Sequence, residues 1–360
     1  MDRLPPKLVR RLVLAPVLLV VSMLLLALAP VLLVGAAIAD LVLPGRWRTV
    51  RLVAFGLCYL ALEIVGLLVL FALWVRAGFG RSLRSPKSIQ AHYAFMGWWL
   101  KVINGAARVL FGLRIRIEDR PTPRPGPVLV FCRHAGIGNS MLLIGTIMIG
   151  YRRRPRIVML AKLQWDPLAD TIFNRVPNRF IKHDPSRRHL YTQAIGDLAT
   201  GLSDIDAFVL FPEGKDFTPR VRRRAIDYLR SKGHDRAADR AEGMLHVLPP
   251  RHGGVMAAMR AAPAADIVFV AHAVLEDVGT LKELWSRIPF ERPIVGRYWR
   301  IPQSEAPTEE AALIDWLYSW WERIDAWVDE HEREHGIRRL RPPAEGEPPP
   351  ELAEGSGSGP

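Results

Sequence analysis

Two polar residues interrupt an apolar stretch in a way that suggests chemistry. The segment VLVFCRHAGIGNSMLL (residues 128–143) is apolar on both sides of His134 and Asn139. A histidine can take a proton from an alcohol when a neighbouring group fixes its tautomer and orientation, and the side-chain oxygen of Asn139 is a candidate for that group. The alternative is that Asn139 only caps the following helix and that His134 is a structural residue in a turn. The spacing alone does not separate these two interpretations.

A second short stretch places an acid at the end of an apolar run. In FVLFPEGKDFTP (residues 208–219) a proline and a glycine flank Glu213, so that a sharp turn presents this acid after a buried strand. Pro-Glu-Gly turns also occur by chance, and the stretch is informative only together with His134.

In this order, the two stretches resemble the motifs of the lysophospholipid acyltransferases, the family that makes phosphatidic acid and remodels phospholipids. That family carries H-x-x-x-x-D in its first block and F-P-E-G in its third. NRFIKHD (178–184) is similar to its second block, and DIVFVAHAV (266–274) to its last conserved strand. FPEGKDFT and HVLPPRHGG are most similar to the branch that acts on lysophosphatidylinositol and lysocardiolipin. The resemblance covers about residues 90–300.

The resemblance implies an O-acyltransferase that moves an acyl group from acyl-CoA or acyl-ACP to the free hydroxyl of a lysophospholipid such as 1-acylglycerol-3-phosphate. No bound cofactor is implied. His134 aligns with the general base, and Asn139 with the acid that orients it. The residues that align with the substrate-binding blocks are Phe180, Ile181, Lys182, His183, Phe211, Pro212, Glu213 and Gly214, to which the branch adds Pro250, Arg251 and Gly254.

The chain departs from the family at the orienting acid, which is Asn139 here. An amide oxygen can hold the tautomer of a histidine but brings no negative charge, and the corresponding exchange in a serine protease costs about 10⁴ in rate. Three nearby acids are candidates to replace the missing charge: Asp166, Asp170 and Asp184.

It also departs at two basic positions. Lys182 and His183 stand where the second block has an arginine, and Lys215-Asp216 follows F-P-E-G where many members have Thr-Arg. Lys215, Arg220 or the cluster Arg222–Arg224 are candidates for the charge that binds a phosphate, although the cluster is equally consistent with a solvated helix face.

These departures leave two other functions open. One is a catalytically weak or silent relative that binds lipid, for which Asn139 is the main support. The other is an acyltransferase for a lipid acceptor without a phosphate, which the missing arginines favour.

The elements that position these residues alternate between strands and helices, which predicts an α/β domain with a mainly parallel sheet flanked by helices. Strands are expected at 113–119, 127–132, 156–162, 206–211, 266–275 and 293–301, and helices at about 139–150, 187–201, 218–232 and 255–262. Residues 163–186 are expected to be irregular. His134 and Glu213 each follow a strand, at the edge where parallel sheets place their sites.

Two apolar runs precede this domain. Residues 12–39 contain no charged residue and 52–75 contain only Glu63, so that each is long enough to span a bilayer. We expect a transmembrane hairpin over residues 1–88, with both ends and the catalytic domain on the cytoplasmic face because basic residues flank it. A cleaved signal peptide is the alternative for the first run, which is longer than such peptides usually are. A helix at 89–112 is expected at the membrane interface, or else packed inside the protein.

A domain over 89–338 is expected to end in an amphipathic helix at 308–336, with Thr308 as its N-cap and its apolar face packed on the domain. Membrane contact is the alternative for that face. The Pro-, Glu- and Gly-rich residues 339–360 are expected to form a disordered tail.

The net charge of +13 raises the question of a nucleic-acid partner. No nucleic-acid-binding motif accompanies the charge, and attraction to anionic lipid headgroups explains it for a membrane-anchored chain. The expected partners are therefore membrane lipids, the lysophospholipid acceptor and the acyl donor, including acyl carrier protein. The histidines show no paired spacing for a metal, and the two cysteines suggest no disulfide framework.

Overall fold

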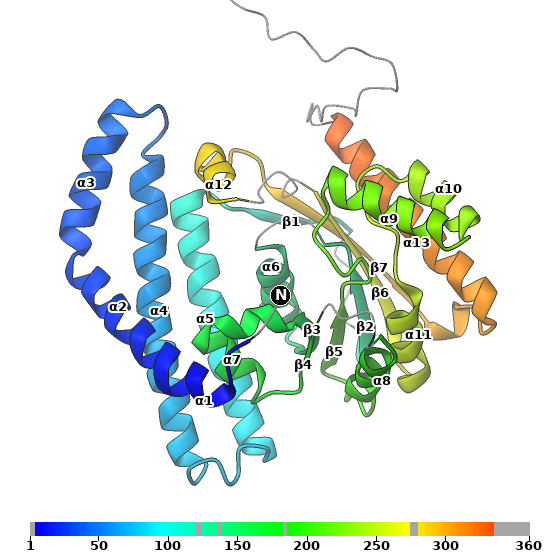
Figure 1. Cartoon of the computed structure of the whole chain (residues 1–360), viewed down its shortest axis with the longest axis horizontal. Helices are drawn as coiled ribbons and strands as arrows, with labels where there is room; N and C mark the ends of the chain where they lie inside the picture. Colours follow the sequence, from blue (N-terminus) through cyan, green and yellow to red (C-terminus); the bar gives the residue numbers. More distant parts are fainter. Residues whose placement is uncertain are drawn as a thin grey trace, which may run out of the picture.

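A seven-stranded sheet is the centre of the α/β domain (Figure 1). The computed structural model describes residues 4–119, 124–134, 138–182, 186, 188–273 and 280–334, and the side chains of Asn139 and Arg188 are not among the parts described. The strands are β1 (Ile115–Ile117), β2 (Val128–Cys132), β3 (Arg154–Leu160), β4 (Arg179–Ile181), β5 (Asp206–Leu210), β6 (Asp266–Ala273) and β7 (Ile294–Ile301).

The order of the strands is β1-β7-β6-β2-β5-β3-β4, and neighbouring strands are parallel except for the antiparallel pair β6 and β7. The predicted fold class, a mainly parallel sheet flanked by helices, is confirmed. β2 lies between β5 and β6, with Val130 opposite Val209 on one side and Val268 on the other. The carboxyl ends of β2, β5, β3 and β4 therefore meet at one edge of the sheet, and His134 and Glu213 follow two adjacent strands there.

Both faces of the sheet are covered, which explains why its strands read as continuous apolar runs rather than alternating ones. One face packs against α8 (Arg188–Ala199), α9 (Pro219–Ser231), α10 (Asp235–Gly243), α11 (His252–Ala261) and α13 (Glu310–Glu334). The other packs against α4 (Arg48–Arg76), α5 (Pro86–Phe111), α6 (Asn139–Gly145) with its π-helical continuation (Thr146–Gly150), and α7 (Pro167–Phe173). Leu129 and Phe131 of β2 face the first layer, and Val128 and Val130 face the second.

Sequence reasoning missed several short elements. Residues 163–186, expected to be irregular, contain most of a 3₁₀ helix (Ala161–Trp165), α7 and the edge strand β4. Helices α10 and α12 (Leu281–Arg287) were also not expected. All of them are at most nine residues long, too short for a periodic pattern to identify them against their polar and proline-containing surroundings.

The first apolar run forms two helices instead of one. A helical segment comprising α1 (Lys7–Val9), a π-helical turn (Arg10–Leu14) and α2 (Ala15–Ala27) is followed at Leu28 by α3 (Ala29–Val42). Pro30 explains the break, because proline has no N–H and its ring disfavours a continuous helix through the preceding turn. Lys7–Ala27 and Arg48–Arg76 are each long and apolar enough to cross a membrane.

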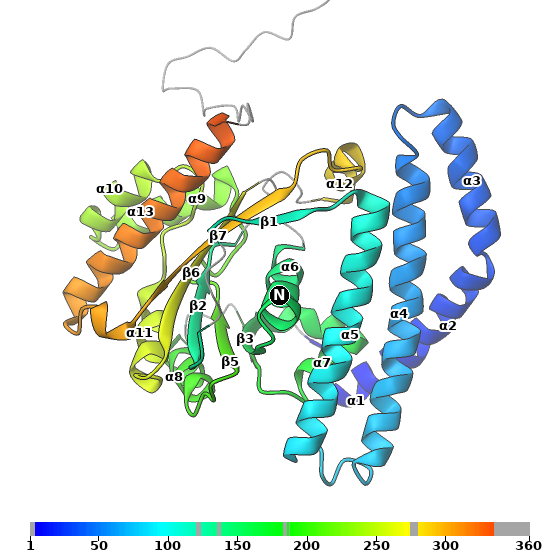
Figure 2. The ribbon, with the colours of Figure 1, turned by 180° about the vertical axis from the view of Figure 1, so that it is seen from behind.

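The α/β domain lies alongside these helices (Figure 2). Near the start of α4, Arg48 donates to the carbonyl of Ile288 over 2.9 Å, and near its end the carbonyl of Leu70 accepts from Arg175 over 2.6 Å. Between them, the hydroxyl of Tyr59 donates to Asp166 over 2.6 Å. Because the domain contacts α4 along most of its length, this helix is part of the same folded unit.

Helix α5 is buried between α4 and the sheet along its predicted apolar stripe. Tyr93, Met96, Leu100 and Ile103 are all buried, whereas Trp98 is exposed. The stripe therefore packs inside the protein, as in the second interpretation of this helix. Contact of the exposed side with a membrane interface stays a prediction.

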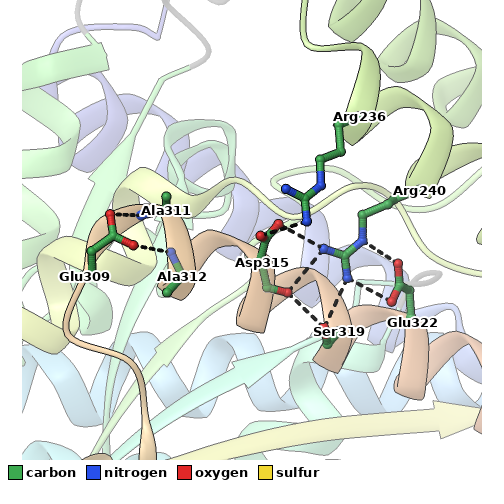
Figure 3. A network of polar contacts seen from close by, with 8 residues as sticks. All are labelled: Arg236, Arg240, Glu309, Ala311, Ala312, Asp315, Ser319 and Glu322. Atoms are coloured by element: carbon green, nitrogen blue, oxygen red, sulfur yellow. Dashed lines mark hydrogen bonds and ion pairs between the residues drawn. The ribbon is translucent and has the colours of Figure 1, made fainter.

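Helix α13 packs on the sheet as expected, with Leu317, Ile324 and Val328 buried in the core. Its cap differs from the prediction. The carboxylate of Glu309 accepts from the backbone N–H groups of Ala311 and Ala312, which makes Glu309 and not Thr308 the capping residue (Figure 3). A carboxylate at this position also interacts favourably with the helix dipole.

An arginine network attaches α13 to α10. Arg240 of α10 forms a two-pronged contact with the carboxylate of Glu322 at 2.6 and 2.8 Å, and Arg236 lies 2.9 Å from Asp315 (Figure 3). Such bidentate pairs fix orientation well. The residues 339–360, predicted to be disordered, lie outside the part of the chain that the structure describes.

The packing of α4 on α7 can be tested at two glycines of α4. A Cβ on Gly66 would lie 2.6 Å from Cδ1 of Leu168, whereas nothing lies within 4 Å of one on Gly56. We expect Gly66→Leu to lower the free energy of unfolding by about 1–3 kcal/mol through overpacking. The matched change Gly56→Leu should leave it unchanged or raise it, since leucine is a better helix former. Thermal unfolding in detergent measures both, and equal effects would contradict the described contact.

Candidate active site

His134 lies immediately after β2 and is mostly enclosed, with 20% of its side chain exposed. Its ring packs on Phe211 with the centroids 4.6 Å apart. Its Nδ1 atom lies 3.2 Å from Oδ1 of Asp216, which belongs to the turn after β5. This is a close charge contact that is not aligned as a hydrogen bond.

The surroundings of His134 favour the neutral imidazole. Burial lowers its pKa, Asp216 opposes this effect, and Lys162 adds to it, with a net decrease. A histidine with a lowered pKa is unprotonated at neutral pH and can act as a base. Lys162 comes from the segment that follows β3, so three strand ends contribute to the electrostatics of this side chain.

The turn after β5 is attached directly to the turn after β2. The N–H of Phe217 donates to the carbonyl of His134 over 2.9 Å, and within the turn the N–H of Gly214 donates to the carbonyl of Phe211 over 3.0 Å. Gly214 has a φ of 69°, a conformation that favours glycine. The local sequence Phe-Pro-Glu-Gly thus makes the tight turn that brings Asp216 to His134.

Arg251 closes the site on one side. Its backbone N–H donates to the carbonyl of Pro212 over 3.0 Å. If Gly214 carried a Cβ, that atom would lie 3.3 Å from the guanidinium of Arg251. The residue is exposed at the edge of the turn. A side chain at position 214 would push against this guanidinium, which gives Gly214 a second reason to be glycine.

Glu213 faces the protein interior and is 2% exposed. Its Oε1 atom accepts from the indole N–H of Trp321 in α13 over 3.3 Å. Burial raises the pKa of Glu213 to about 8, against the opposing effects of Arg133, Trp321 and the backbone N–H groups of His134 and Leu248. The assignment of this motif to substrate binding stays a prediction, and Glu213 itself lies beneath the site.

Arg133 is a buried residue of the site that sequence reasoning missed. It is fully buried and donates to the carbonyls of His246 and His272, in both cases over 2.6 Å. It therefore connects the end of β2 to the end of β6 and to the loop before α11. The sequence did contain a signal for this role, because Arg133 directly follows an apolar strand. A charged residue is unusual in a protein core unless hydrogen bonds or an opposite charge compensate for its burial.

The second-block residues lie at the far end of the same edge. Phe180 and Ile181 are partly buried in β4, which pairs with β3 (Leu160 opposite Ile181), and Lys182 is exposed just after it. His183 lies outside the described residues. Lys215 and Arg220 are both exposed, on the turn after β5 and at the start of α9.

Asn139 is the first residue of α6, and Gly138, with a φ of 89°, occupies the N-cap. The interpretation of Asn139 as the helix cap is therefore wrong. Its side chain is not among the parts of the chain that the structure describes, so its role as the orienting group stays a prediction.

Two of the three acids expected to replace the missing carboxylate form contacts away from His134. Asp166 caps α7 through the N–H of Ala169, and the buried Asp170 pairs with Arg10 at 3.0 Å. The expectation that either acid supports His134 is therefore wrong, because these carboxylates attach the N-terminal helices to the domain. Asp184 lies outside the described residues. The acid that does lie beside His134, Asp216, was noted only as a departure from the family pattern.

One arginine of the predicted cluster, Arg222, has a structural role. Arg222 donates to the backbone carbonyls of Ala241, Glu242 and Met244 and therefore holds the end of α10. It is not available to a ligand in this arrangement. Arg223 and Arg224 are exposed on α9.

An apolar pocket opens on the His134 side of the sheet, beneath α6. Its walls include Val130 and Cys132 of β2, Val270 of β6, and Leu142 and Leu143 of α6. Cys132, at the end of β2, is the lining residue nearest to His134 in the sequence, and His134 itself is not part of the lining. Within the described ranges, no group of three or more metal-ligating side chains is assembled.

One of the comparisons with known proteins, the match to a family model, agrees with the acyltransferase resemblance. Residues 114–275 match the family model described as Acyltransferase. The chain is similar to the crystal structure of the 1-acyl-sn-glycerophosphate (LPA) acyltransferase PlsC from Thermotoga maritima, with 13% identity and a TM-score of 0.45, over 81% of this chain and 100% of that one. No curated protein matches the chain. The matched family segment contains both His134 and the Phe-Pro-Glu-Gly turn.

Burial of Glu213 predicts a specific dependence of stability on pH. Because its folded pKa is about 8 and its usual pKa is 4.5, the unfolded chain releases this proton first as the pH rises between those values. The free energy of unfolding should then fall by up to about 1.4 kcal/mol per pH unit on account of this group. Glu213→Gln should flatten the thermal-unfolding profile across this window, whereas the exposed control Glu305→Gln should not. An unchanged slope in Glu213→Gln would contradict the buried, neutral carboxyl.

Proposed function

We propose that this protein is a lysophospholipid acyltransferase that uses His134 as a general base. The observation that carries the proposal is the pairing of His134 with the Phe-Pro-Glu-Gly turn at the ends of two adjacent strands, within the segment that matches the Acyltransferase family model. The acceptor is a lysophospholipid such as 1-acylglycerol-3-phosphate, and the donor is acyl-CoA or acyl-ACP.

The proposed reaction is a direct transfer. Nε2 of His134 takes the proton from the acceptor hydroxyl, whose oxygen attacks the carbonyl carbon of the thioester. Collapse of the tetrahedral intermediate breaks the carbon–sulfur bond, and the imidazolium returns the proton to the leaving thiolate. The products are a new ester and a free thiol, and no acyl-enzyme is formed.

The apolar pocket beneath α6 is suited to a fatty acyl chain. It starts beside Cys132 and continues between Val130 and Leu143, among side chains that offer an alkyl chain burial without hydrogen-bonding demands. We propose that an acyl chain enters this pocket at its Cys132 end, the end of β2 that leads to His134. We propose that the depth of this pocket limits the acyl-chain length.

The N-terminal helices would hold the site at a membrane. The side of α2 and α3 away from α4 is rich in exposed apolar side chains, among them Val20, Leu24, Val31 and Ile38. Such a surface is unfavourable in water and is typical of lipid contact. We propose that this side is embedded in the bilayer and that the catalytic domain, which lies alongside α4, faces the cytoplasm, where an amphiphilic acceptor enters without leaving the membrane.

The central test is release of thiol from acyl-CoA by the detergent-purified protein with a panel of lysophospholipids, repeated with acyl-ACP. Release should depend on the acceptor and fall by about 10²–10⁴ in His134→Gln, the usual contribution of a general base. The control His189→Gln, an exposed histidine on α8, should behave as wild type. If wild type releases no thiol from either donor, the proposal is contradicted, and the two alternatives, a lipid-binding relative and an acyltransferase for an acceptor without a phosphate, are favoured instead.

Arg251 provides a test of the phosphate acceptor. If its guanidinium binds the phosphate, Arg251→Gln should raise the KM for 1-acylglycerol-3-phosphate about 10-fold or more, as expected for a charged hydrogen bond, with a small change in kcat. Monoacylglycerol, which lacks the phosphate, should be used equally well by both forms. The control Arg224→Gln removes an exposed arginine of α9. Equal losses with both acceptors would indicate a structural role for Arg251 instead.

A further inference from the structure

The pairing of Asp216 with His134 accounts for the missing acid of the first motif. Position 139 carries an amide, so the loop after β2 provides no carboxylate there to support the imidazole. The turn after β5 does provide one, because Asp216 follows Glu213 by three residues and its Oδ1 lies 3.2 Å from Nδ1 of His134. The carboxylate reaches the same ring from the neighbouring strand.

Two features of the fold hold Asp216 in this place. The N–H of the next residue, Phe217, donates to the carbonyl of His134, and Phe217 itself is buried. On the other side, the positive φ of Gly214 turns the chain back toward β2. The backbone on both sides of Asp216 is thus fixed relative to the ring, while its side chain is half exposed.

The other charged groups near His134 do not support its imidazole as Asp216 does. Lys162, in the segment after β3, lowers the pKa of His134 and has the wrong sign to support an imidazolium. Glu213 is directed into the core toward Trp321. Asp166 and Asp170 are held by α7 and Arg10.

We infer that Asp216 is the positioning residue of this site and takes the role that an acid at position 139 has in the family pattern. The inference rests on the proposed function of His134. Asp216 holds the tautomer with the proton on Nδ1, leaves Nε2 free to accept the proton of the acceptor hydroxyl, and offsets the positive charge that develops on the ring. It does not contact the substrate and takes up no proton itself.

A carboxylate exchange between the two turns tests the inference. Asp216→Asn should lower kcat by about 10²–10⁴ with little change in KM. Adding Asn139→Asp to this variant should restore kcat to within about tenfold of wild type, because the carboxylate returns from the other turn. Asp227→Asn, which removes an exposed acid from α9, is the control, and Asp216→Glu should keep more activity than Asp216→Asn. Thermal unfolding confirms that each variant is folded.

The dependence of kcat/KM on pH separates a positioning role of Asp216 from a purely structural one, because a structural role would not shift the pKa of His134. Because Asp216 raises the pKa of His134 and Lys162 lowers it, removal of the carboxylate should shift the acidic limb of kcat/KM to lower pH. The titration of His134 followed by NMR in the resting protein should shift in the same direction, with or without turnover. Wild-type kcat and an unshifted titration in Asp216→Asn would overturn the inference. If Asp216→Asn shifts the titration of His134 but the wild-type protein transfers no acyl group, only the proposed function is refuted.

Discussion

The burial of two ionisable side chains beneath the strand ends is the constraint on which the site depends. Arg133 and Glu213 follow adjacent strands and are both removed from water, so their polar atoms must be satisfied by protein. Nη1 and Nη2 of Arg133 donate to the carbonyls of His272 and His246, and Oε1 of Glu213 accepts from the indole of Trp321. These partners come from β6, the loop before α11, and α13. The same contacts that satisfy the buried groups therefore bring five segments of the chain together.

This arrangement leaves the neighbouring residues for chemistry. Arg133 donates to the carbonyls of His246 and His272, whereas the ring of His134 packs on Phe211. One polar residue thus anchors the turn while the next contacts the turn after β5. Helix α13 contributes through Trp321, although it lies more than a hundred residues further along the chain. The helix is fixed in turn by the Arg240–Glu322 contact and by its Glu309 cap.

Much of the sheet could be predicted from the sequence, because apolar runs bounded by turn residues mark strands whatever their neighbours are. His134 and Glu213 were correctly placed after two strands for the same reason. The role of Arg133 and the proximity of Asp216 could not be predicted, since both depend on β2 lying between β5 and β6, an order that local pattern does not reveal. The short helix α7 was missed, and with it the use of Asp166 and Asp170 to attach the N-terminal helices.

The account requires that Nε2 of His134 meets the hydroxyl of the acceptor while Nδ1 faces Asp216. The most direct measurement is an experimental structure of the protein with a lysophospholipid and an unreactive thioether analogue of acyl-CoA. The account predicts the acceptor hydroxyl within about 2.6–3.2 Å of Nε2 and the alkyl chain of the analogue in the pocket beneath α6. A hydroxyl bound away from the ring, or Nε2 turned toward Asp216, would contradict it.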